Sequence, residues 1–413
     1  MENQQMEKTI GLIGDNIRFS YSPQIHALLG DYKYTLWEIT ENELDVFMTK
    51  KAFDAINVTI PFKKKVIPYL SYISPEAKRI GAVNTIVNRA GKLFGYNTDY
   101  KGFCDLLDTN CIALEKRKVL ILGNGGAAAT VKTVAEDRNA SEIVIISRKG
   151  EDNYTNLEKH KDANVIINTT PVGKYPHIDD SPIESLDIFT KLEAVADLTY
   201  NPHRTVIMRM AEARGCKTGG GLTMLISQAI AAKHCFFGQE CTVDIKAHTQ
   251  EIAKKHLVNI ILIGMPGSGK SSIGKVIAKK SGREFIDIDD EIEKSEKRKP
   301  SQIIKEDGEP AFRKIEGEIL RKNCLGLKKV IASGGGAITT EEGRDAIRQG
   351  GAVVFIERDI SLLDKSDRPL SQGSLDKLYE SRIDFYRNTA DYIIDGNADI
   401  DTVSERLIKE VLL

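Results

Sequence analysis

Two glycine-rich turns, each leading from a short apolar strand into a helical segment, constrain the fold of this chain more than any other feature. The first is VLILGNGGAAAT at residues 119–130, and the second is ILIGMPGSGKSS at residues 261–272. Such a turn presents backbone N–H groups at a helix N-terminus, where phosphate groups bind. Because β-branched runs alternate with helical patterns nearly throughout, the chain is predicted to be an α/β protein built on parallel sheets.

The length and charge of the chain limit the classes of protein to which it can belong. Its 413 residues exceed one ordinary core, so we expect two or three domains. Lysine and arginine (58) balance aspartate and glutamate (59), which gives no support for binding nucleic acid or a membrane surface. The sequence has no signal-peptide pattern, no bilayer-spanning apolar run and no CxxC pair. We therefore expect a cytoplasmic protein with reduced cysteines.

The order of strand and helix patterns divides the chain into four segments. We predict an α/β domain over 1–100 and 220–245, the second part forming one long amphipathic helix. A Rossmann-like nucleotide-binding domain is predicted over 101–219. A polar helical linker over 246–257 then leads to a further α/β unit over 258–413, which has the size of a single domain.

The second glycine turn contains GMPGSGKS, which fits the G-x-x-x-x-G-K-[ST] pattern of a P-loop. Gly267 and Gly269 let backbone N–H groups curl round the β-phosphate of a nucleotide. Lys270 is predicted to contact the β- and γ-phosphate oxygens, while Ser271 ligates Mg²⁺ and Ser272 follows at the start of the helix. The motif predicts ATP binding, but by itself it leaves the phosphoryl acceptor open.

An acidic pair and an arginine–glutamate pair follow the P-loop. EFIDIDDEIE places Asp287 and Asp289 at the end of a strand, where residues two apart face the same side. One carboxylate could lie near the metal while the other binds a hydroxyl group that attacks the phosphate. EPAFRKIEGE places Arg313 and Glu316 on one helical face. The alternatives are an ordinary acidic strand end and solvated helix charges.

Three further features in the last third of the chain suggest an anionic acceptor. IASGGGAI is a strand followed by glycines 334–336, which would allow a ligand to approach the backbone closely. DKSDRPLSQG is a basic segment that contains Arg368, and SRIDFYRNTADYII contains Arg382. Together with Arg313, these separated arginines beside a carboxylate pair favour an anionic polyol as the phosphoryl acceptor.

This ordered series, P-loop, FxDxDxxIE, FRxxE, GGG, RPL and RxxxYxxxA, resembles shikimate kinase over residues 258–413. The resemblance implies a P-loop fold like that of nucleoside monophosphate kinases, with ATP and Mg²⁺. It implies that Lys270, Asp289 and Arg368 act in catalysis, with Arg368 closing a lid over the transferred phosphate. Ser271 and Asp287 would hold the metal. The shikimate ring hydroxyls and carboxylate would be bound by Asp289 and by Arg313, Gly335, Gly336 and Arg382.

The first glycine turn predicts a dinucleotide site, with a purely structural strand–helix turn as the alternative. Its predicted contacts to the cofactor are Gly123, Gly125, Gly126 and Ala127. The next strand, EIVIISRKG, ends in Arg148 and Lys149 rather than in an acidic residue. Basic groups at this position suit the 2′-phosphate of NADP, whereas an acidic residue would bind the ribose of NAD.

Polar residues near the N-terminus are the candidate substrate contacts. Ser20 and Ser22 precede Pro23 and could bind a carboxylate, although they could also cap a helix. Lys63 lies in a lysine run, which is usually solvated surface, and Asp99 lies in an Asn-Thr-Asp segment that could be a plain turn.

Taken in order, the motifs SxSP, NVTxPxK, GAVNT, NTDxxGF, GxGGA, NTTPxG, YNPxxT and GxxMLxxQA resemble shikimate dehydrogenase over residues 9–238. The resemblance implies that Lys63 and Asp99 form the catalytic pair. It places the substrate against Ser20, Ser22, Thr59, Asn84, Tyr200 and Gln228. The chain departs from the family at Asn16, Phe19 and Asn124, and Ser147-Arg148-Lys149 replaces the usual NRT.

The two resemblances together predict one bifunctional enzyme. NADPH would reduce 3-dehydroshikimate to shikimate, and ATP would then phosphorylate shikimate to shikimate 3-phosphate in the synthesis of chorismate and aromatic amino acids. Two alternatives stay open: a quinate/shikimate-type dehydrogenase, or a non-catalytic binding module joined to an active kinase. The sequence predicts small-molecule substrates and leaves both a monomer and a homodimer possible.

Overall fold

The computed structural model describes residues 8–18, 20–238, 245–363 and 375–412. The chain forms two compact units. Unit 1 comprises Met1–Val172, Asp180–Tyr200 and Met210–Gln250, and unit 2 comprises Gly173–Asp179, Asn201–Arg209 and Glu251–Leu413. The four domain boundaries predicted from the sequence stay predictions.

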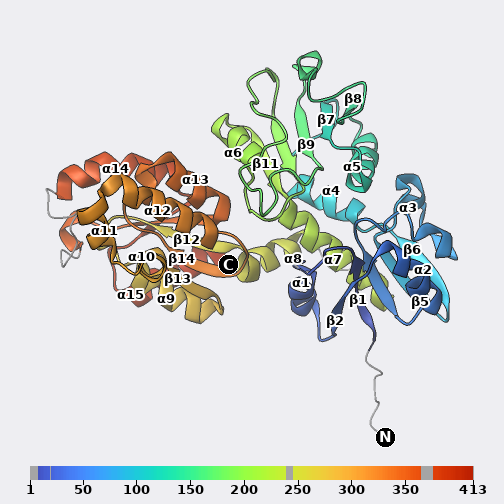
Figure 1. The fold of residues 1–413 in the computed structure, drawn as a ribbon, viewed down its shortest axis with the longest axis horizontal. Coiled ribbons are helices and arrows are strands. Elements are labelled where there is room, and N and C mark those ends of the chain that lie inside the picture. The colour runs from blue at the N-terminus through green and yellow to red at the C-terminus, as the bar shows by residue number, and fades with distance from the viewer. Residues whose placement is uncertain (1–7, 19, 239–244, 364–374, 413) are drawn as a thin grey trace, which may run out of the picture. The chain divides into compact units, whose positions relative to one another are not determined.

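Unit 1 begins with a six-stranded mixed sheet in the order β2-β1-β3-β5-β6-β4 (Figure 1). Its strands are β1 (Ile10–Gly14), β2 (Tyr34–Glu38), β3 (Ala55–Val58), β4 (Tyr72–Ile73), β5 (Thr85–Arg89) and β6 (Lys92–Tyr96). The accompanying helices are α1 (Ser22–Leu29), α2 (Glu41–Lys50), the 3₁₀ turn η1 (Ile67–Tyr69) and α3 (Pro75–Ile80). The β5–β6 hairpin turns through Ala90 and Gly91, both with positive φ, which reverses the chain tightly.

The second sheet of unit 1 is fully parallel, in the order β11-β10-β9-β7-β8. Its strands are β7 (Lys118–Leu122), β8 (Glu142–Ile146), β9 (Val165–Asn168), β10 (Ala194–Asp197) and β11 (Lys217–Gly220). The accompanying elements are the helices α4 (Asp99–Thr109), α5 (Gly126–Asp137) and α7 (Gly221–Phe237) and the turn η2 (Leu157–His160). Buried Val119, Ile121, Val165 and Ile167 pack against α4 and α5. Strands β7, β9 and β10 are buried almost throughout, as expected for a parallel sheet covered on both faces.

Unit 2 contains a five-stranded parallel sheet in the order β13-β14-β12-β15-β16. Alternation along β12 (Asn259–Ile263) divides the core between its two faces. Ile261 and Ile263 belong to one buried cluster, and Ile260 and Leu262 belong to the other. Helices therefore cover both faces of this sheet (Figure 1).

The remaining strands of unit 2 are β13 (Glu284–Asp287), β14 (Lys329–Ala332), β15 (Gly351–Glu357) and β16 (Tyr392–Asp395). Its helices are α9 (Lys270–Ser281), α10 (Ile288–Glu296), α11 (Pro300–Asp307), α12 (Glu309–Asn323), α13 (Glu341–Gly350), α14 (Leu375–Thr389) and α15 (Ile400–Leu407), with short turns at η4 (Ala337–Thr339), η5 (Ile360–Leu362) and η7 (Ile408–Leu412). Connecting segments elsewhere include α6 (Val206–Ala213), α8 (Ile245–Ile252) and the π-helical turn η3 (Ala253–Leu257).

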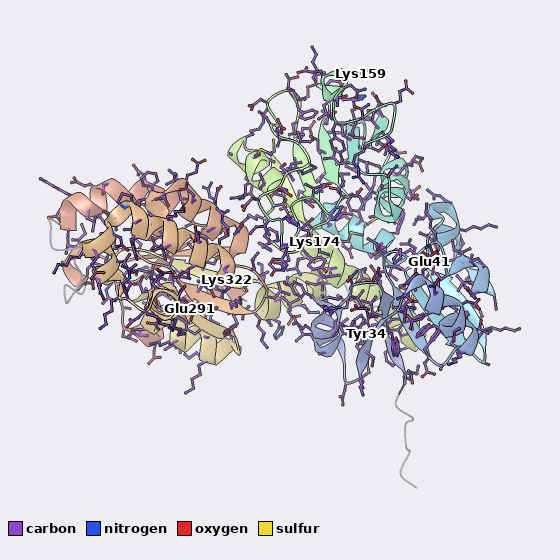
Figure 2. The ribbon with its side chains drawn as sticks, viewed as in Figure 1. Tyr34, Glu41, Lys159, Lys174, Glu291 and Lys322 are labelled. Carbon is purple, nitrogen blue, oxygen red and sulfur yellow. The ribbon has the colours of Figure 1, made fainter. Side chains whose placement is uncertain are left out.

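Charged side chains lie on the surface of both units. Figure 2 labels Glu41 and Lys159 in unit 1 and Lys322 in unit 2, and all three are exposed. Within the described ranges, no helix is both long enough and apolar enough to cross a membrane. The α/β class predicted from the sequence is confirmed, with parallel sheets in both units.

Candidate active sites

The first glycine turn joins β7 to α5 in unit 1. Gly123 has φ 104°, and a side chain there would come within 2.8 Å of the Thr169 hydroxyl, so glycine is required. Gly125 is the residue before α5, which has no side-chain cap. A Cβ added at Gly125 or Gly126 would meet nothing within 4 Å. Uncapped N–H groups beside open space fit the pyrophosphate of a dinucleotide.

Arg148 and Lys149 lie in the turn that follows β8, beside the first glycine turn. Leu122 at the end of β7 is paired with Ile146 at the end of β8, and the Gly123 N–H donates to the Ile146 carbonyl at 2.8 Å. Both basic side chains are exposed. The position next to the glycine turn suits the 2′-phosphate of NADP.

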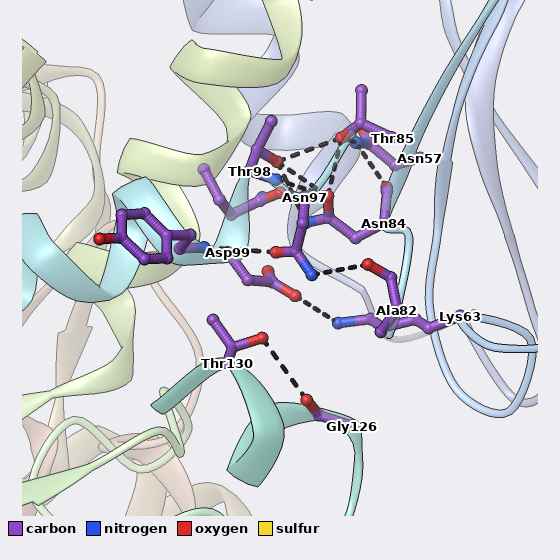
Figure 3. A network of polar contacts seen from close by, with 12 residues as sticks. Asn57, Lys63, Ala82, Asn84, Thr85, Asn97, Thr98, Asp99, Gly126 and Thr130 are labelled. Carbon is purple, nitrogen blue, oxygen red and sulfur yellow. Dashed lines mark hydrogen bonds and ion pairs between the residues drawn. The ribbon is translucent and has the colours of Figure 1, made fainter. Parts of the chain in front are cut away.

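Lys63 and Asp99 form a close ion pair in unit 1 (Figure 3). The Lys63 ammonium donates to Asp99 Oδ2 at 2.6 Å. The Lys63 side chain is 20% exposed and that of Asp99 10%, so Lys63 is not the solvated surface group of its alternative interpretation. Asp99 is the first residue of α4, while Lys63 is fixed by its carbonyl, which accepts from the Val83 N–H at 2.8 Å. Two segments far apart in sequence thus bring this pair together.

Asn84 lies beside this pair in a buried polar network (Figure 3). Its Oδ1 accepts from the Thr98 N–H at 2.7 Å, and its Nδ2 donates to the Thr98 hydroxyl at 3.0 Å. Thr98 immediately precedes Asp99, so the network fixes Asn84 relative to the ion pair. Thr59 follows β3 close by, because the Val58 N–H donates to the Asn84 carbonyl at 2.8 Å.

The other predicted substrate contacts of unit 1 lie on three segments. The Ser20 hydroxyl donates to the Ser22 hydroxyl at 3.1 Å and accepts from the Ser22 N–H at 3.2 Å at the start of α1, so the capping alternative stays open. Gln228 lies on α7 and packs closely on α4: a Cβ added at Gly102 in α4 would come within 3.2 Å of the Gln228 Cβ. The Tyr200 ring lies 5.3 Å from that of Tyr21.

The second glycine turn joins β12 to α9 in unit 2. Gly264, Gly267 and Gly269 all have positive φ, and Gly269 precedes an α9 that has no side-chain cap. The Lys270 ammonium is buried and donates to the carbonyls of Gly264 and Met265 at 2.9 and 3.0 Å. These contacts hold the lysine inside the loop, and its contact with the ATP phosphates stays a prediction.

Ser271 and Asp287 offer oxygen ligands for a metal beside this loop. The Ser271 hydroxyl donates to Asp287 Oδ2 at 2.5 Å. A hydroxyl and a carboxylate are the ligand types that Mg²⁺ prefers next to nucleotide phosphates. The prediction that Asp287 and Asp289 lie on one strand and face the same side is wrong, because β13 ends at Asp287 and α10 begins at Ile288. Asp287 instead caps α10 and accepts from the Asp289 N–H at 3.0 Å.

Arg313 and Glu316 form a buried pair on α12. One guanidinium nitrogen of Arg313 donates to Glu316 at 2.7 Å and the other to Glu309 at 2.9 Å. Burial raises the pKa of Glu316, and Arg313 opposes this shift. Glu316 also interacts electrostatically with Asp289 and Arg382. Four of the charged groups that the sequence analysis singled out therefore share one site.

Glycines 334–336 pack directly on that charged cluster. A Cβ at Gly334 would lie 2.0 Å from Glu316 Oε1, and one at Gly336 would lie 2.0 Å from an Arg313 nitrogen. A Cβ at Gly335 would lie 2.8 Å from the Pro266 ring in the P-loop. Glycine is therefore required here for contact with the protein's own side chains, a reason that sequence reasoning missed.

Tyr386 and Arg382 on α14 both bind the Gly335 carbonyl, at 2.5 and 3.1 Å. Tyr386 is fully buried and stacks on Phe355 with ring centroids 5.0 Å apart. Burial raises the pKa of the Tyr386 phenol, so it remains a donor. Tyr386 is the tyrosine of the RxxxYxxxA motif, but the sequence analysis assigned it no role, although its spacing of four residues from Arg382 places both on one helical face. Arg368, the predicted lid residue, lies outside the described residues.

The folds and these two sites define a class of protein, a nucleotide-dependent enzyme with a dinucleotide turn in one unit and a P-loop in the other. Residues 12–86 match the shikimate dehydrogenase substrate-binding domain family, and residues 266–412 match the shikimate kinase family. A shikimate dehydrogenase (NADP(+)) of Clostridium beijerinckii is 39% identical over 256 residues, covering 57% of this chain and 93% of the relative. One of Chlorobaculum tepidum is 35% identical, covering 60% and 97%.

Solved structures agree with these sequence matches. A shikimate dehydrogenase of Peptoclostridium difficile superposes with a TM-score of 0.54 at 35% identity, covering 58% of this chain and 95% of that one. The Thermus thermophilus enzyme, solved in complex with NADP(H) and shikimate, gives 0.52 at 30% identity, covering 58% and 98%.

The chain belongs to the shikimate dehydrogenase family. Its residues 266–412 add a shikimate kinase domain, so the chain is a fusion of the two, a bifunctional enzyme of the shikimate pathway. Its cofactors are NADP in the dehydrogenase part and ATP with Mg²⁺ in the kinase part.

Proposed function

We propose that unit 1 reduces 3-dehydroshikimate to shikimate with NADPH and that unit 2 phosphorylates shikimate to shikimate 3-phosphate. The observation that carries this proposal is the 2.6 Å Lys63–Asp99 pair beside the Asn84 network, within the chain region that matches shikimate dehydrogenase. The Asp289, Arg313 and Arg382 cluster next to the P-loop supports the second step. We also propose that the dehydrogenase part comprises residues 1–245 and the kinase domain 258–413, joined by 246–257.

In the reduction, Lys63 acts on the oxygen of the substrate carbonyl. Bound NADPH would supply the hydride, in the turn of Gly123, Gly125, Gly126 and Ala127 with Arg148 and Lys149 beside it. As the carbonyl carbon is reduced, negative charge develops on its oxygen, and the Lys63 ammonium stabilises that charge and delivers a proton. Asp99 orients the ammonium through its carboxylate. General acid catalysis of this kind contributes about 10²- to 10⁴-fold in rate.

The remaining residues of unit 1 hold the substrate. Ser20 and Ser22 would bind the substrate carboxylate through hydroxyl donors. Thr59, Asn84, Tyr200 and Gln228 would bind the ring and its hydroxyl groups. Neutral hydrogen bonds of this kind each contribute about 0.5–1.5 kcal/mol net, so the set provides specificity rather than rate.

In the phosphorylation, the enzyme mainly positions the reactants and stabilises charge. ATP with Mg²⁺ would supply the phosphoryl group at the P-loop, where Gly267, Gly269, Lys270 and Ser272 bind phosphate and where Ser271 and Asp287 hold the metal. Arg313 and Arg382 would clamp the carboxylate of shikimate, with Gly335 and Gly336 beneath it. Asp289 would accept a hydrogen bond from the attacking hydroxyl, and Arg368 would close over the phosphate.

One coupled assay tests both steps. Purified protein is incubated with 3-dehydroshikimate, NADPH and MgATP, the absorbance of NADPH is followed, and the product is identified by mass. We expect NADPH consumption and the mass of a shikimate monophosphate, with NMR assigning the 3-position. NADPH consumption with 3-dehydroquinate as well as with 3-dehydroshikimate would favour a quinate/shikimate-type dehydrogenase. Phosphorylation of added shikimate without any NADPH consumption would show that unit 1 is a non-catalytic module.

A further inference from the structure

Tyr34 on β2 is joined to Asn84 by a chain of side-chain hydrogen bonds. The Tyr34 phenol donates to Asn57 Oδ1 at 2.7 Å (Tyr34 is labelled in Figure 2). Asn57 Nδ2 donates to the Thr85 hydroxyl at 3.0 Å and to the Asn84 carbonyl at 3.2 Å. The Thr85 hydroxyl lies 3.0 Å from Asn84 Oδ1 (Figure 3). Three side chains on three strands thus lead to Asn84, a predicted substrate contact.

The direction of each bond in this chain of hydrogen bonds follows from backbone groups of fixed role. The Asn84 carbonyl can only accept, so it holds the Asn57 amide with Nδ2 toward Asn84 and with Oδ1 toward the Tyr34 phenol. Asn57 therefore presents donors to Thr85, and Thr85 must accept there and direct its own proton elsewhere. With Asn84 Oδ1 as acceptor from Thr85 and from the Thr98 N–H, the Asn84 amide nitrogen takes the opposite side.

The Tyr34 ring, at the start of this chain of hydrogen bonds, is held in place by its neighbours. Tyr34 stacks on His26 with ring centroids 3.9 Å apart and an interplanar angle of 8°. Burial lowers the pKa of His26 to about 3, so this ring stays neutral at physiological pH. His26 in turn contacts the Tyr32 hydroxyl through Nδ1 at 2.6 Å. A fixed ring gives the Tyr34 phenol a fixed donor direction.

We propose that Tyr34 and Asn57 are positioning residues that hold the Asn84 amide with its N–H group available to the substrate. The inference rests on the proposed reduction and deepens it, because it states what sets affinity for the hydroxylated ring. Asn84 Nδ2 uses one N–H on the Thr98 hydroxyl, and its second N–H has no partner within the described residues. Without the Tyr34 phenol, Asn57 Oδ1 would lose its donor, and Asn57 would hold the Asn84 carbonyl and the Thr85 hydroxyl less firmly.

The first test is Tyr34→Phe, which keeps the stacked ring and removes only the hydroxyl. We expect the KM for 3-dehydroshikimate to rise about three- to tenfold, as for one neutral hydrogen bond, while kcat and the KM for NADPH stay within about twofold. Tyr69→Phe is the matched control, because it removes an exposed phenol that donates to Asp45 at 3.0 Å. A proportional fall in kcat, or the same change in the control, would overturn the proposal.

A double-mutant cycle separates positioning from a general structural effect. If Tyr34 acts through Asn84, the effect of Tyr34→Phe on KM disappears in an Asn84→Ala background. Asn84→Asp serves as a second background that keeps the side-chain shape. Because Tyr34 also contacts Ser22, the cycle is repeated with Ser22→Ala. Additive effects, or coupling confined to Ser22, would overturn the assignment to Asn84.

The same proteins distinguish failure of the inference from failure of the proposed function. Wild-type turnover of 3-dehydroshikimate is measured beside every variant, and shikimate binding is measured by calorimetry. A wild type that turns nothing over refutes the proposed reduction, and the calorimetric cycle then still tests the positioning role. An active wild type without coupling between Tyr34 and Asn84 refutes only the inference.

Discussion

The two glycine turns solve the same problem, holding phosphate at a helix N-terminus, by different means. The turn before α5 has one positive φ, at Gly123, and open space over Gly125 and Gly126. The turn before α9 has three positive φ values and folds round the buried Lys270 ammonium. The first offers a phosphate backbone donors and the helix dipole. The second adds a fixed positive charge.

This difference matches what each turn has to do. A dinucleotide pyrophosphate only has to be held while chemistry takes place at the far end of the cofactor. A transferred phosphoryl group gathers charge during the reaction itself, so a lysine and a metal next to it lower the barrier. The lysine proposed as the general acid of unit 1 is accordingly not in its glycine turn but at Lys63, in a turn that follows β3 of the other sheet.

The largest effect should come from removing the metal. Excess EDTA should abolish phosphorylation of shikimate, because Ser271 and Asp287 would lose the ion that they are predicted to hold beside the ATP phosphates. Reduction of 3-dehydroshikimate should continue at its full rate, because Lys63 and Asp99 require no metal. Restoring Mg²⁺ should restore the kinase reaction. Loss of reduction under the same conditions would contradict this division between the two turns.

Replacing each of the two lysines by alanine tests the same division between the two units. Lys270→Ala should lower phosphorylation by about 10³-fold, because a cation at the transferred phosphate is lost, and leave reduction unchanged. Lys63→Ala should do the reverse, with a loss within the range of about 10²- to 10⁴-fold for a general acid. Both activities are measured on each variant, so each serves as the folding control for the other. A variant that loses both would show that the two units are coupled.

The local features of the sites were predictable from the sequence. Both glycine turns lie between a strand and a helix, as their motifs require. These predictions succeeded because the backbone requirement of each motif is contained in a few consecutive residues.

Contacts between distant segments were not predictable in the same way. The Tyr34–Asn57–Thr85 chain crosses β2, β3 and β5, and its existence depends on register between strands. The aspartate pair was placed on one strand because period-two logic assumes that the strand continues, whereas Asp287 caps a helix. The packing of glycines 334–336 on Arg313 and Glu316 likewise depends on tertiary contacts.

Two alanine substitutions separate the structural from the binding role of glycine in the first turn. Gly123→Ala should lower the melting temperature of the protein, because its φ of 104° and the nearby Thr169 hydroxyl strain any side chain. Gly125→Ala has room and an ordinary φ of −80°, so stability should not change. If pyrophosphate occupies the space over Gly125, the KM for NADPH should nevertheless rise, by roughly tenfold for one lost charge-assisted contact. An unchanged KM would place the cofactor elsewhere.

The smallest expected effect concerns the choice between NADPH and NADH. Arg148 is exposed, and an exposed ion pair is worth about 0.2–1 kcal/mol, so Arg148→Ala should raise the KM for NADPH only about two- to fivefold. The KM for NADH should not change, because NADH lacks the 2′-phosphate. Lys159→Ala removes another exposed charge of unit 1 and is the matched control. Raising the salt concentration should shrink the Arg148 effect, since exposed charges are screened. An equal loss with both cofactors would mean that Arg148 supports the turn itself, and the preference for NADP would then have to come from Lys149 or from the glycine turn.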